Sequence, residues 1–407
     1  MRRVVVTGIG AVTPVGNSAA EFADAIFSGR NGIGTITRFD IADSKCKVAA
    51  EVRDFDPAKR LDKTTIRKTD LFTQYALYAA DEAMEDSGIA GTVDECRFGV
   101  IIGSGVGGIG TLTAEEDALA AGGQRKVSPQ FVPKMIINIA AGQAAIRYHA
   151  HGAVSAVVTA CASGTDAVGE AFRRIRDGYS DAMICGGTEA AVNPLTVAGF
   201  VNCMALTQSE DPGAASLPFD ARRGGFVLGE GAAILILEEY EHAAARGAKI
   251  YCEITGYGAT CDAYHVTAPA PDTTYVARAI TDAAAGLDVP ADQLYVNAHG
   301  TGTPMNDVGE TAAFKQAFGD DAYKLHISST KSMTGHMLGA AGAIEAIACV
   351  LALQNDTVPP TINLLTPDEK CDLNYTPGTA VKTPLAGAIS TSLGFGGHNA
   401  CLAFKKI

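Results

Sequence analysis

The chain has 407 residues, of which 47% are hydrophobic, and its formal net charge at pH 7 is −13. A chain of this length buries a large core and predicts two domains or two fused halves, while the acidic balance argues against nucleic acid as the main partner. The ten cysteines are scattered without a C-x-x-C pair. We therefore expect neither a metal site nor a disulfide framework, and a reducing cytoplasm fits their distribution.

The N-terminus begins with an apolar run that Thr7, Gly8 and Gly10 interrupt, which indicates a strand and a turn rather than a signal peptide. No uninterrupted apolar stretch approaches the length needed to span a bilayer, so no membrane partner is expected. Short apolar runs ending in small residues recur along the chain, with helical stretches such as 71–87 and 337–353 between them. Strands that alternate with helices predict an α/β fold with mixed sheets.

The two halves of the chain repeat one unit, which consists of a strand, a polar elbow and then a helix. Cys161 begins such a unit in the first half, and His336 begins one in the second half. The charged segment 237–249 places the boundary near residue 250. The prediction is an N-terminal half, residues 1–250, that carries the cysteine, and a C-terminal half, residues 251–407, that carries the candidate histidines.

Cys161 stands where the apolar run 153–158 gives way to small residues and then to a helical pattern. The free N–H groups and the positive dipole end of a helix N-terminus favour thiolate over thiol. Small flanking residues also leave room for a substrate. A free cysteine is nevertheless more often a small buried core residue than a nucleophile, so this position alone leaves both interpretations open.

Two of the eight histidines stand in unusual settings. His299 follows an apolar strand in the loop "NAHGTGTP", and His336 lies between a polar loop and a long apolar helix. A lone loop histidine is more often structural than catalytic. Two such histidines and a cysteine, all at strand ends where α/β folds place their chemistry, favour a shared site.

Further polar groups accompany these three. Lys331, five residues before His336, either forms a structural ion pair or raises the positive potential near a thiolate. Glu345 interrupts an apolar helix, so we expect it to be buried and paired, either to stabilise the fold or to orient the site. The glycine-rich segment 394–399 lacks phosphate-loop spacing and favours a turn whose N–H groups approach a ligand. Together these groups indicate acyl transfer through a cysteine thioester.

Four segments resemble, in order and spacing, the signatures of the β-ketoacyl-acyl carrier protein synthases of the thiolase superfamily. They are "TACASG", "NAHGTGTPMND", "SSTKSMTGHMLGAAG" and "GFGGHN". Supporting stretches such as "PFDARRGGFVLGEGA", "DAYHVTAP" and the closing "FKKI" extend the resemblance over nearly the whole chain, which is most similar to the synthase II group of bacterial type II fatty-acid synthesis. The family implies a five-layered αβαβα fold of two similar halves, a homodimer, and decarboxylative Claisen condensation in fatty-acid chain elongation.

The resemblance implies a role for each catalytic group. Cys161 takes the acyl chain as a thioester, and His299 and His336 stabilise the enolate formed when malonyl-acyl carrier protein loses carbon dioxide. Lys331 supports the histidine site electrostatically, and Glu345 orders it. The enolate then attacks the thioester and gives a chain two carbons longer.

Other residues are implied to contact the substrate. Phe395 resembles the family's gating phenylalanine, and its N–H, with that of Cys161, resembles the oxyanion hole. The hydroxyls implied to bind the phosphopantetheine arm belong to Thr301 and Thr303. The acyl pocket is implied to be lined by Val106 and Phe200.

The implied partner is acyl carrier protein, which brings the phosphopantetheine arm with it, so no separate cofactor is expected. Acyl carrier protein is strongly acidic, as this chain is overall, so docking requires a local basic surface. On the resemblance and on charge clustering, we expect this surface to consist of Lys63, Arg67, Lys68, Arg125 and Lys126.

The chain departs from the family's pattern at several positions that carry no catalytic group. His398 takes the place of the usual threonine after "GFGG", Leu393 replaces an aromatic residue, and Thr391 stands where asparagine is common. Leu217 replaces an arginine, and Gly224 replaces a common aspartate. These departures bear on loop movement and on carrier docking.

Three other kinds of protein share parts of this pattern. A biosynthetic thiolase requires a second cysteine where this chain has Phe395, and Cys401 lies beyond that loop. A chain-length factor that only pairs with a ketosynthase would lack the nucleophile, so Cys161 argues against it. The ketosynthase subunit of a type II polyketide synthase shares the same catalytic groups and remains the alternative.

Overall fold

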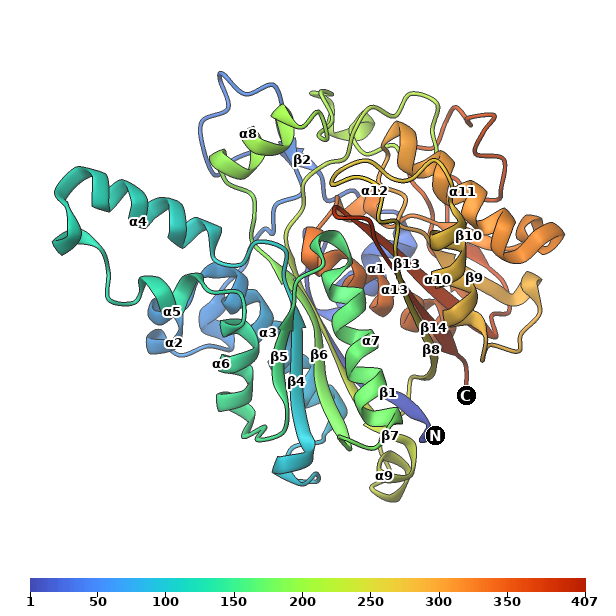
Figure 1. Cartoon of the computed structure of the whole chain (residues 1–407), viewed down its shortest axis with the longest axis horizontal. Helices are drawn as coiled ribbons and strands as arrows, with labels where there is room; N and C mark the ends of the chain where they lie inside the picture. The colour runs from blue at the N-terminus through green and yellow to red at the C-terminus, as the bar shows by residue number, and fades with distance from the viewer.

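A computed structural model describes all 407 residues, and ten of its strands form one mixed sheet (Figure 1). The order across this sheet is β10-β9-β13-β14-β8-β1-β7-β6-β4-β5. The bounds of these strands are Val4–Val12 (β1), Phe98–Gly103 (β4), Val154–Val157 (β5), Ala182–Glu189 (β6), Gly231–Glu239 (β7), Cys252–Cys261 (β8), Leu294–Asn297 (β9), His326–Ser328 (β10), Gly387–Gly394 (β13) and His398–Lys405 (β14). Two small two-stranded sheets pair Gly34–Thr35 (β2) with Val48–Ala49 (β3), and Thr357–Val358 (β11) with Val381–Lys382 (β12).

The ten-stranded sheet repeats one five-stranded pattern. In the first half, β5, β4 and β6 are parallel, and β7 and β1 follow antiparallel. In the second half, β10, β9 and β13 are parallel, and β14 and β8 follow antiparallel. The halves meet where Val4–Val6 of β1 pairs with β8. This repeat confirms the prediction of an α/β fold built from two similar halves.

The helices pack against the faces of the sheet and form layers that alternate with its two halves. The α-helices are Ala19–Ser28 (α1), Lys63–Lys68 (α2), Leu71–Ser87 (α3), Ile109–Gly122 (α4), Phe131–Met135 (α5), Ile139–Tyr148 (α6), Ser163–Arg176 (α7), Pro194–Asn202 (α8), Tyr240–Ala245 (α9), Thr274–Ala284 (α10), Pro304–Phe318 (α11), Lys331–Thr334 (α12) and Ala341–Asn355 (α13). Outside the sheet, α3 packs on β1 and β7, and α10 packs on β8 and β14. Between the halves, α7 and α13 pack on each other and on strands of both, which gives the five layers αβαβα.

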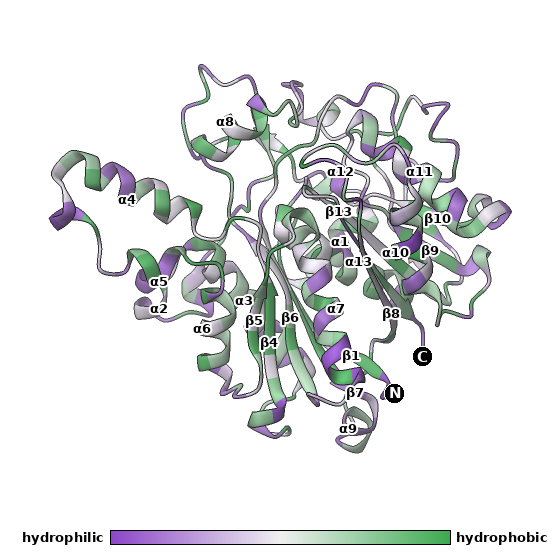
Figure 2. Ribbon diagram, viewed as in Figure 1, coloured by the Kyte–Doolittle hydropathy of each residue, from purple (hydrophilic) through white to green (hydrophobic).

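The largest core cluster, with 47 buried residues, lies around α7 and α13. Strands covered on both faces are largely apolar, and Figure 2 shows the buried strands β4 and β6 largely green while α7 alternates between green and purple. The segment Leu338–Asn355, which includes α13, is long and apolar enough to cross a membrane by composition. It is 89% buried within the molecule, so it is a core helix.

The helical predictions agree closely with the structure. The helix predicted over 71–87 is α3, which Asp70 caps by accepting the Phe72 N–H at 3.2 Å. The helix predicted from 337 begins later, at Ala341, because residues 338–340 form a 3-10 turn.

The connection between β4 and β5 carries α4, α5 and α6, and α4 projects from the body of the molecule (Figure 1). No residue of α4 or α5 is buried. An element with no buried residue contributes little to a monomer's core. The projecting arm is therefore not held by the apolar packing that holds the rest of the fold.

Candidate active site

Cys161 lies in a short 3-10 turn between β5 and α7, as its sequence setting predicts. The turn is sharp, and Ala160 adopts a left-handed conformation with φ of 51°, which is strained for a residue with a side chain. Ser163 braces it, because its hydroxyl accepts the Thr159 N–H at 2.9 Å and donates to the Ala160 carbonyl at 2.7 Å. The turn after β13 lies against this elbow, since a Cβ on Gly394 would come within 2.6 Å of the Thr159 carbonyl oxygen.

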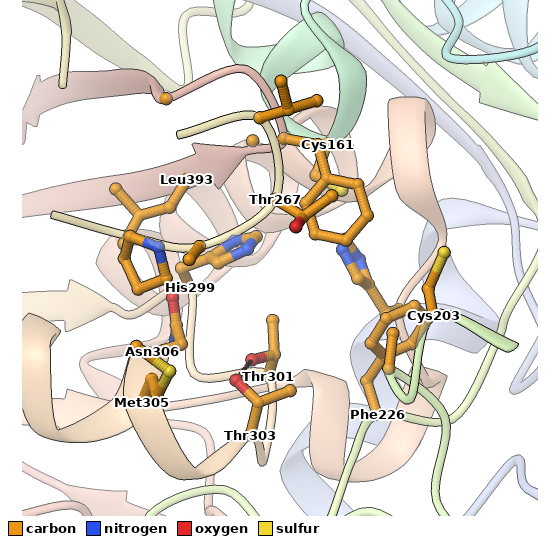
Figure 3. A pocket seen from close by; sticks show the side chains of 18 of the residues that line it. Cys161, Cys203, Phe226, Thr267, His299, Thr301, Thr303, Met305, Asn306 and Leu393 are labelled. Carbon is orange, nitrogen blue, oxygen red and sulfur yellow. Dashed lines mark hydrogen bonds between the residues drawn. The ribbon is translucent and has the colours of Figure 1, made fainter. Parts of the chain in front are cut away.

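The two histidines lie together in the same cavity as Cys161, which has a volume of about 410 Å³ (Figure 3). The imidazole centroids of His299 and His336 are 5.3 Å apart, and their planes are nearly perpendicular. Their exposed fractions are only 3% and 2%. Phe226, which the sequence analysis did not single out, packs edge-on against His336 with centroids 5.0 Å apart. The structure therefore brings together three groups that lie far apart in the chain.

Both imidazoles are neutral donors. Burial lowers the pKa of His299 and of His336 well below the usual value of 6.5, and the positive charge of Lys331 lowers both further. The Lys331 ammonium lies 3.3 Å from Nδ1 of His299. Because an ammonium only donates, Nδ1 accepts and the proton of His299 sits on Nε2.

Lys331 and Glu345 form a buried ion pair that connects α12 to α13. Burial raises the pKa of Glu345 to about 7, and the neighbouring Lys331 charge lowers it. The sequence left a structural role and an orienting role open for this glutamate. The chain of contacts from Glu345 through Lys331 to His299 favours the orienting role.

The protonation state of Cys161 differs from the expectation of a stabilised thiolate. Burial raises the pKa of its thiol to about 12. The Lys331 charge and the Phe395 N–H lower this pKa, but the carboxylates of Glu189 and Glu345 raise it. Burial is the largest of these influences, so it favours the thiol over the thiolate at neutral pH.

The loop that carries His299 is anchored by Glu310, which sequence reasoning missed. Glu310 accepts the N–H groups of His299 at 2.7 Å and Gly300 at 2.8 Å. It also accepts the Thr391 hydroxyl at 2.6 Å, and that hydroxyl oxygen accepts the His299 N–H at 3.1 Å. Thr391, a departure from the family's pattern, thus takes part in the anchor. A carboxylate on the helix after the histidine loop was the available signal.

Thr301 and Thr303 line the cavity with Cys161, as Figure 3 shows, and their hydroxyl oxygens are 3.0 Å apart. Arg223 holds the end of this loop by donating to the carbonyls of Thr303 and Pro304, both at 3.2 Å. Arg223 was not predicted as a site residue, although it lies in one of the quoted motifs.

Of the two residues predicted to line the acyl pocket, only Phe200 lines the cavity. Phe200 and Phe395 both line the cavity, with ring centroids 6.4 Å apart. Val106 is not among the lining residues and is 37% exposed, so its place in the acyl pocket stays a prediction. Additional sulfur-containing lining residues, which the sequence did not indicate, are Cys203, Met204 and Met305.

Family models match almost the whole length of this fold. Residues 1–243 match the β-ketoacyl synthase N-terminal domain, and residues 251–365 match the β-ketoacyl synthase C-terminal domain. The chain belongs to the β-ketoacyl synthase family. The predicted family is thereby confirmed.

Individual relatives agree with this assignment. The synthase is 50% identical to the 3-oxoacyl-[acyl-carrier-protein] synthase 2 of Synechocystis sp. over 100% of this chain and 98% of that protein. Its fold superposes on the ishigamide ketosynthase/chain length factor with a TM-score of 0.93, at 35% identity, covering 100% of this chain and 99% of that one. A type II polyketide synthase ketosynthase, solved with its acyl-carrier protein and bound to the hexaketide, gives a TM-score of 0.90 at 35% identity, with 100% and 99% coverage.

The basic residues expected to dock the carrier lie on two separate elements of this synthase. Lys63, Arg67 and Lys68 are exposed on α2, and Arg125 and Lys126 are exposed beyond the end of the projecting α4 (Figure 1). The structure leaves all five accessible. Their joint role in docking stays a prediction.

The remaining departures from the family's pattern have distinct surroundings. Leu393 lines the main cavity, whereas His398 lines a second, polar hollow with Asp166. Leu217 is buried beside Gly302, whose added Cβ would lie 3.3 Å from the Leu217 backbone nitrogen. Gly224 has open space around it, and nothing in the structure explains the glycine there.

Proposed function

We propose that this chain condenses an acyl group, held on Cys161, with malonyl-acyl carrier protein, releasing carbon dioxide and 3-oxoacyl-acyl carrier protein in fatty-acid elongation. One observation carries the proposal: a thiol and two neutral, buried imidazoles share one cavity. A cysteine hydrolase requires only one histidine. A second neutral N–H donor fits an intermediate with a negative oxygen.

In the first half-reaction, the Cys161 sulfur attacks the thioester carbonyl of the acyl carrier protein. The tetrahedral oxyanion is held by the N–H groups of Cys161 and Phe395, in the position of the family's oxyanion hole. Because the pKa of the thiol is raised to about 12, its proton leaves only as the bond forms. The departing phosphopantetheine thiolate takes up that proton, so charge balances.

In the second half-reaction, the carboxylate of the malonyl group leaves as carbon dioxide, and its electron pair forms a thioester enolate. The Nε2–H of His299 and an N–H of His336 donate to the enolate oxygen. The enolate carbon attacks the acyl carbonyl on Cys161, a carbon–carbon bond forms, and the cysteine leaves as a thiolate that solvent reprotonates. Neutral imidazoles suit this role, since they stabilise the charge without protonating the carbon.

The phosphopantetheine arm arrives on the carrier, and no further cofactor is proposed. Thr301 and Thr303 offer hydroxyls along one side of the cavity, and such groups fix a polar arm in an otherwise apolar channel. Phe200 and Phe395 provide apolar surface. Acyl carrier protein as the partner is supported by the solved polyketide ketosynthase that is bound to its own carrier.

The polyketide alternative shares every catalytic group with this proposal. The 3-oxoacyl-[acyl-carrier-protein] synthase 2 of Synechocystis sp. is 50% identical to this chain, whereas the type II polyketide ketosynthase is 35% identical, which favours elongation. The thiolase alternative requires a second reactive cysteine in the active-site loop. Cys401 does not meet this requirement, because it is fully buried within β14.

We also propose a homodimer. β5 is an edge strand of the sheet, and Val154 at its start and Val158 just beyond its end are exposed. Together with the projecting α4, which has no buried residue, this edge offers apolar surface and free backbone groups for a second copy of the chain.

A reducing cytoplasm is the compartment that we propose. All ten cysteines are free, and several, such as Cys252 and Cys349, are fully buried in the core. Oxidising compartments would expose the accessible thiols Cys96 and Cys203 to unwanted disulfide formation.

The test is to incubate the purified chain with acyl- and malonyl-acyl carrier proteins and to follow carrier-bound products by mass spectrometry. We expect carbon dioxide and a 3-oxoacyl product two carbons longer than each of a series of primers. The variant Cys161→Ala should form none of it. Repeated malonyl additions to an acetyl primer alone would favour the polyketide alternative, and reaction of coenzyme A thioesters without decarboxylation would contradict the proposal.

A further inference from the structure

Glu189, the last residue of β6, is completely buried and takes no part in the steps described above. Its carboxylate accepts four hydrogen bonds from two separate turns. Oε1 accepts the Ser104 hydroxyl at 2.9 Å and the Val106 N–H at 3.2 Å. Oε2 accepts the N–H groups of Gly105 at 2.7 Å and Gly339 at 3.0 Å. One side chain thus links the turn after β4 to the turn that follows His336.

The backbones around this carboxylate are in direct contact. A Cβ on Gly339 would come within 2.4 Å of the Gly105 nitrogen and 2.8 Å of Oε2 of Glu189. A Cβ on Gly187 would lie 2.3 Å from the Gly339 carbonyl oxygen, and one on Gly164 would lie 2.8 Å from the same atom. The turn after His336 is therefore packed closely against the turn after β4, against β6 and against α7.

The carboxylate of Glu189 also places a negative charge near the active site, and none of the proposed reaction steps uses that charge. All four partners of Glu189 are uncharged N–H and O–H groups, and burying a carboxylate without a cation is costly. Burial raises the pKa of Glu189, while these hydrogen bonds lower it. Only a carboxylate offers acceptor sites for all four donors, which explains why a glutamate rather than a glutamine stands here.

We propose that Glu189 is a positioning residue for the condensation, which fixes the turn after His336 against the turn that carries Val106 and so sets His336 beside Cys161. The structural basis is the single carboxylate shared by both turns. Misplacing a reacting group by about 1 Å costs about 100-fold in rate. The inference rests on the function proposed above.

The charge of Glu189 has a second effect, which can be measured without substrate. The charges that act on the Cys161 thiol are the carboxylates of Glu189 and Glu345 and the ammonium of Lys331, and the two neutral imidazoles share its cavity. The negative charge of Glu189 raises the pKa of the Cys161 thiol. Removing that charge must therefore lower this pKa and move the alkylation of Cys161 to lower pH.

The experiment uses Glu189→Gln in the full chain. The amide oxygen accepts from only two of the four donors, so we expect kcat for condensation to fall about 10- to 100-fold, with KM for malonyl-acyl carrier protein nearly unchanged. Iodoacetamide alkylation of Cys161, followed by peptide mass spectrometry, should shift to lower pH. Ser104→Ala removes one donor and keeps the charge, so it should lower kcat less and leave the alkylation profile in place.

Glu51→Gln is the matched control. Glu51 is also buried and accepts the Thr37 and Arg38 N–H groups and the Thr37 hydroxyl, but it lies outside the site. It should lower Tm like Glu189→Gln and leave kcat and the alkylation profile unchanged. Equal effects of the two glutamine variants on kcat would overturn the positioning role, and an unshifted Cys161 profile in Glu189→Gln would overturn the electrostatic effect of Glu189 on the thiol. Absence of condensation in the unmodified chain would instead refute the function proposed above.

Discussion

Nζ of Lys331 lies 3.3 Å from Nδ1 of His299 while the same ammonium forms a buried ion pair with Glu345. The ammonium can only donate to that nitrogen, so it fixes the tautomer that presents Nε2–H to the cavity. It also lowers the imidazole pKa. Lys331 therefore keeps His299 neutral and correctly protonated for binding a negative oxygen.

This relationship predicts the result of removing the lysine. Lys331→Met alone removes the cation that lowers the pKa of Glu345, so the buried carboxyl group loses its partner and the fold should be destabilised by about 3–5 kcal/mol. The double variant Lys331→Met/Glu345→Gln removes both charges, and we expect it to fold but to decarboxylate malonyl-acyl carrier protein about 100-fold more slowly. Lys406→Met, which breaks a surface pair with Asp356, is the control and should keep full activity. Full activity in the double variant would contradict the role of Lys331.

Replacing the histidines should separate the half-reactions. In His299→Ala and His336→Ala we expect carbon dioxide release to fall by about 100- to 1000-fold, because each removes one preorganised donor. Transfer of the acyl chain to Cys161 should persist, as measured by intact-protein mass spectrometry. The control is His326→Ala, at the partly exposed start of β10. Undiminished decarboxylation in either cavity variant would exclude that histidine from enolate stabilisation.

The alkylation rate of Cys161 should depend on pH in a way that reflects its burial. Because the thiol pKa is raised to about 12 from an ordinary value of 9.0, the thiolate fraction keeps rising as pH rises past 9. We expect the iodoacetamide rate at Cys161 to increase tenfold per pH unit up to about pH 10, whereas N-acetylcysteine levels off earlier. A plateau for Cys161 below pH 9 would show that the helix N-terminus dominates after all.

The carrier-docking prediction is tested by charge reversal. Arg67→Glu/Lys68→Glu should raise the apparent KM for acyl-acyl carrier protein with kcat little changed, and the effect should shrink as salt screens exposed charges. The matched control is Lys382→Glu, an equally exposed lysine on β12. If both variants give the same KM, docking takes place elsewhere on the surface.

The dimer prediction concerns β5. Val154 and Val381 are both strand valines with 41% of their surface exposed, but only Val154 lies on the edge of the main sheet. We expect Val154→Lys to shift the mass measured by light scattering from two chains toward one, because it places a charge in the contact. Val381→Lys should leave the mass unchanged. A single-chain mass for the unmodified protein would refute the homodimer.

Local patterns in the sequence determined much of this protein. The alternation of apolar runs and helices gave the fold class, and the helix over 71–87 is present with those bounds. The strand, cysteine and helix around Cys161 lie within one continuous segment, so the elbow was predictable without the rest of the chain. The family followed from motifs, each of which is a short run of residues. The boundary near residue 250, the docking residues and the roles of the site residues stay predictions.

Only the tertiary structure decided the chemistry of the site. A pKa depends on what surrounds a group, and burial lowers the pKa of both histidines and raises the pKa of Cys161. The anchors Glu310 and Glu189 also required the fold, because Glu189 binds Gly339, which lies 150 residues away. The distance between two such partners along the sequence does not predict that they meet in the fold. Sequence determines which groups are present, and the packing of distant segments determines which of them meet and in what state of charge.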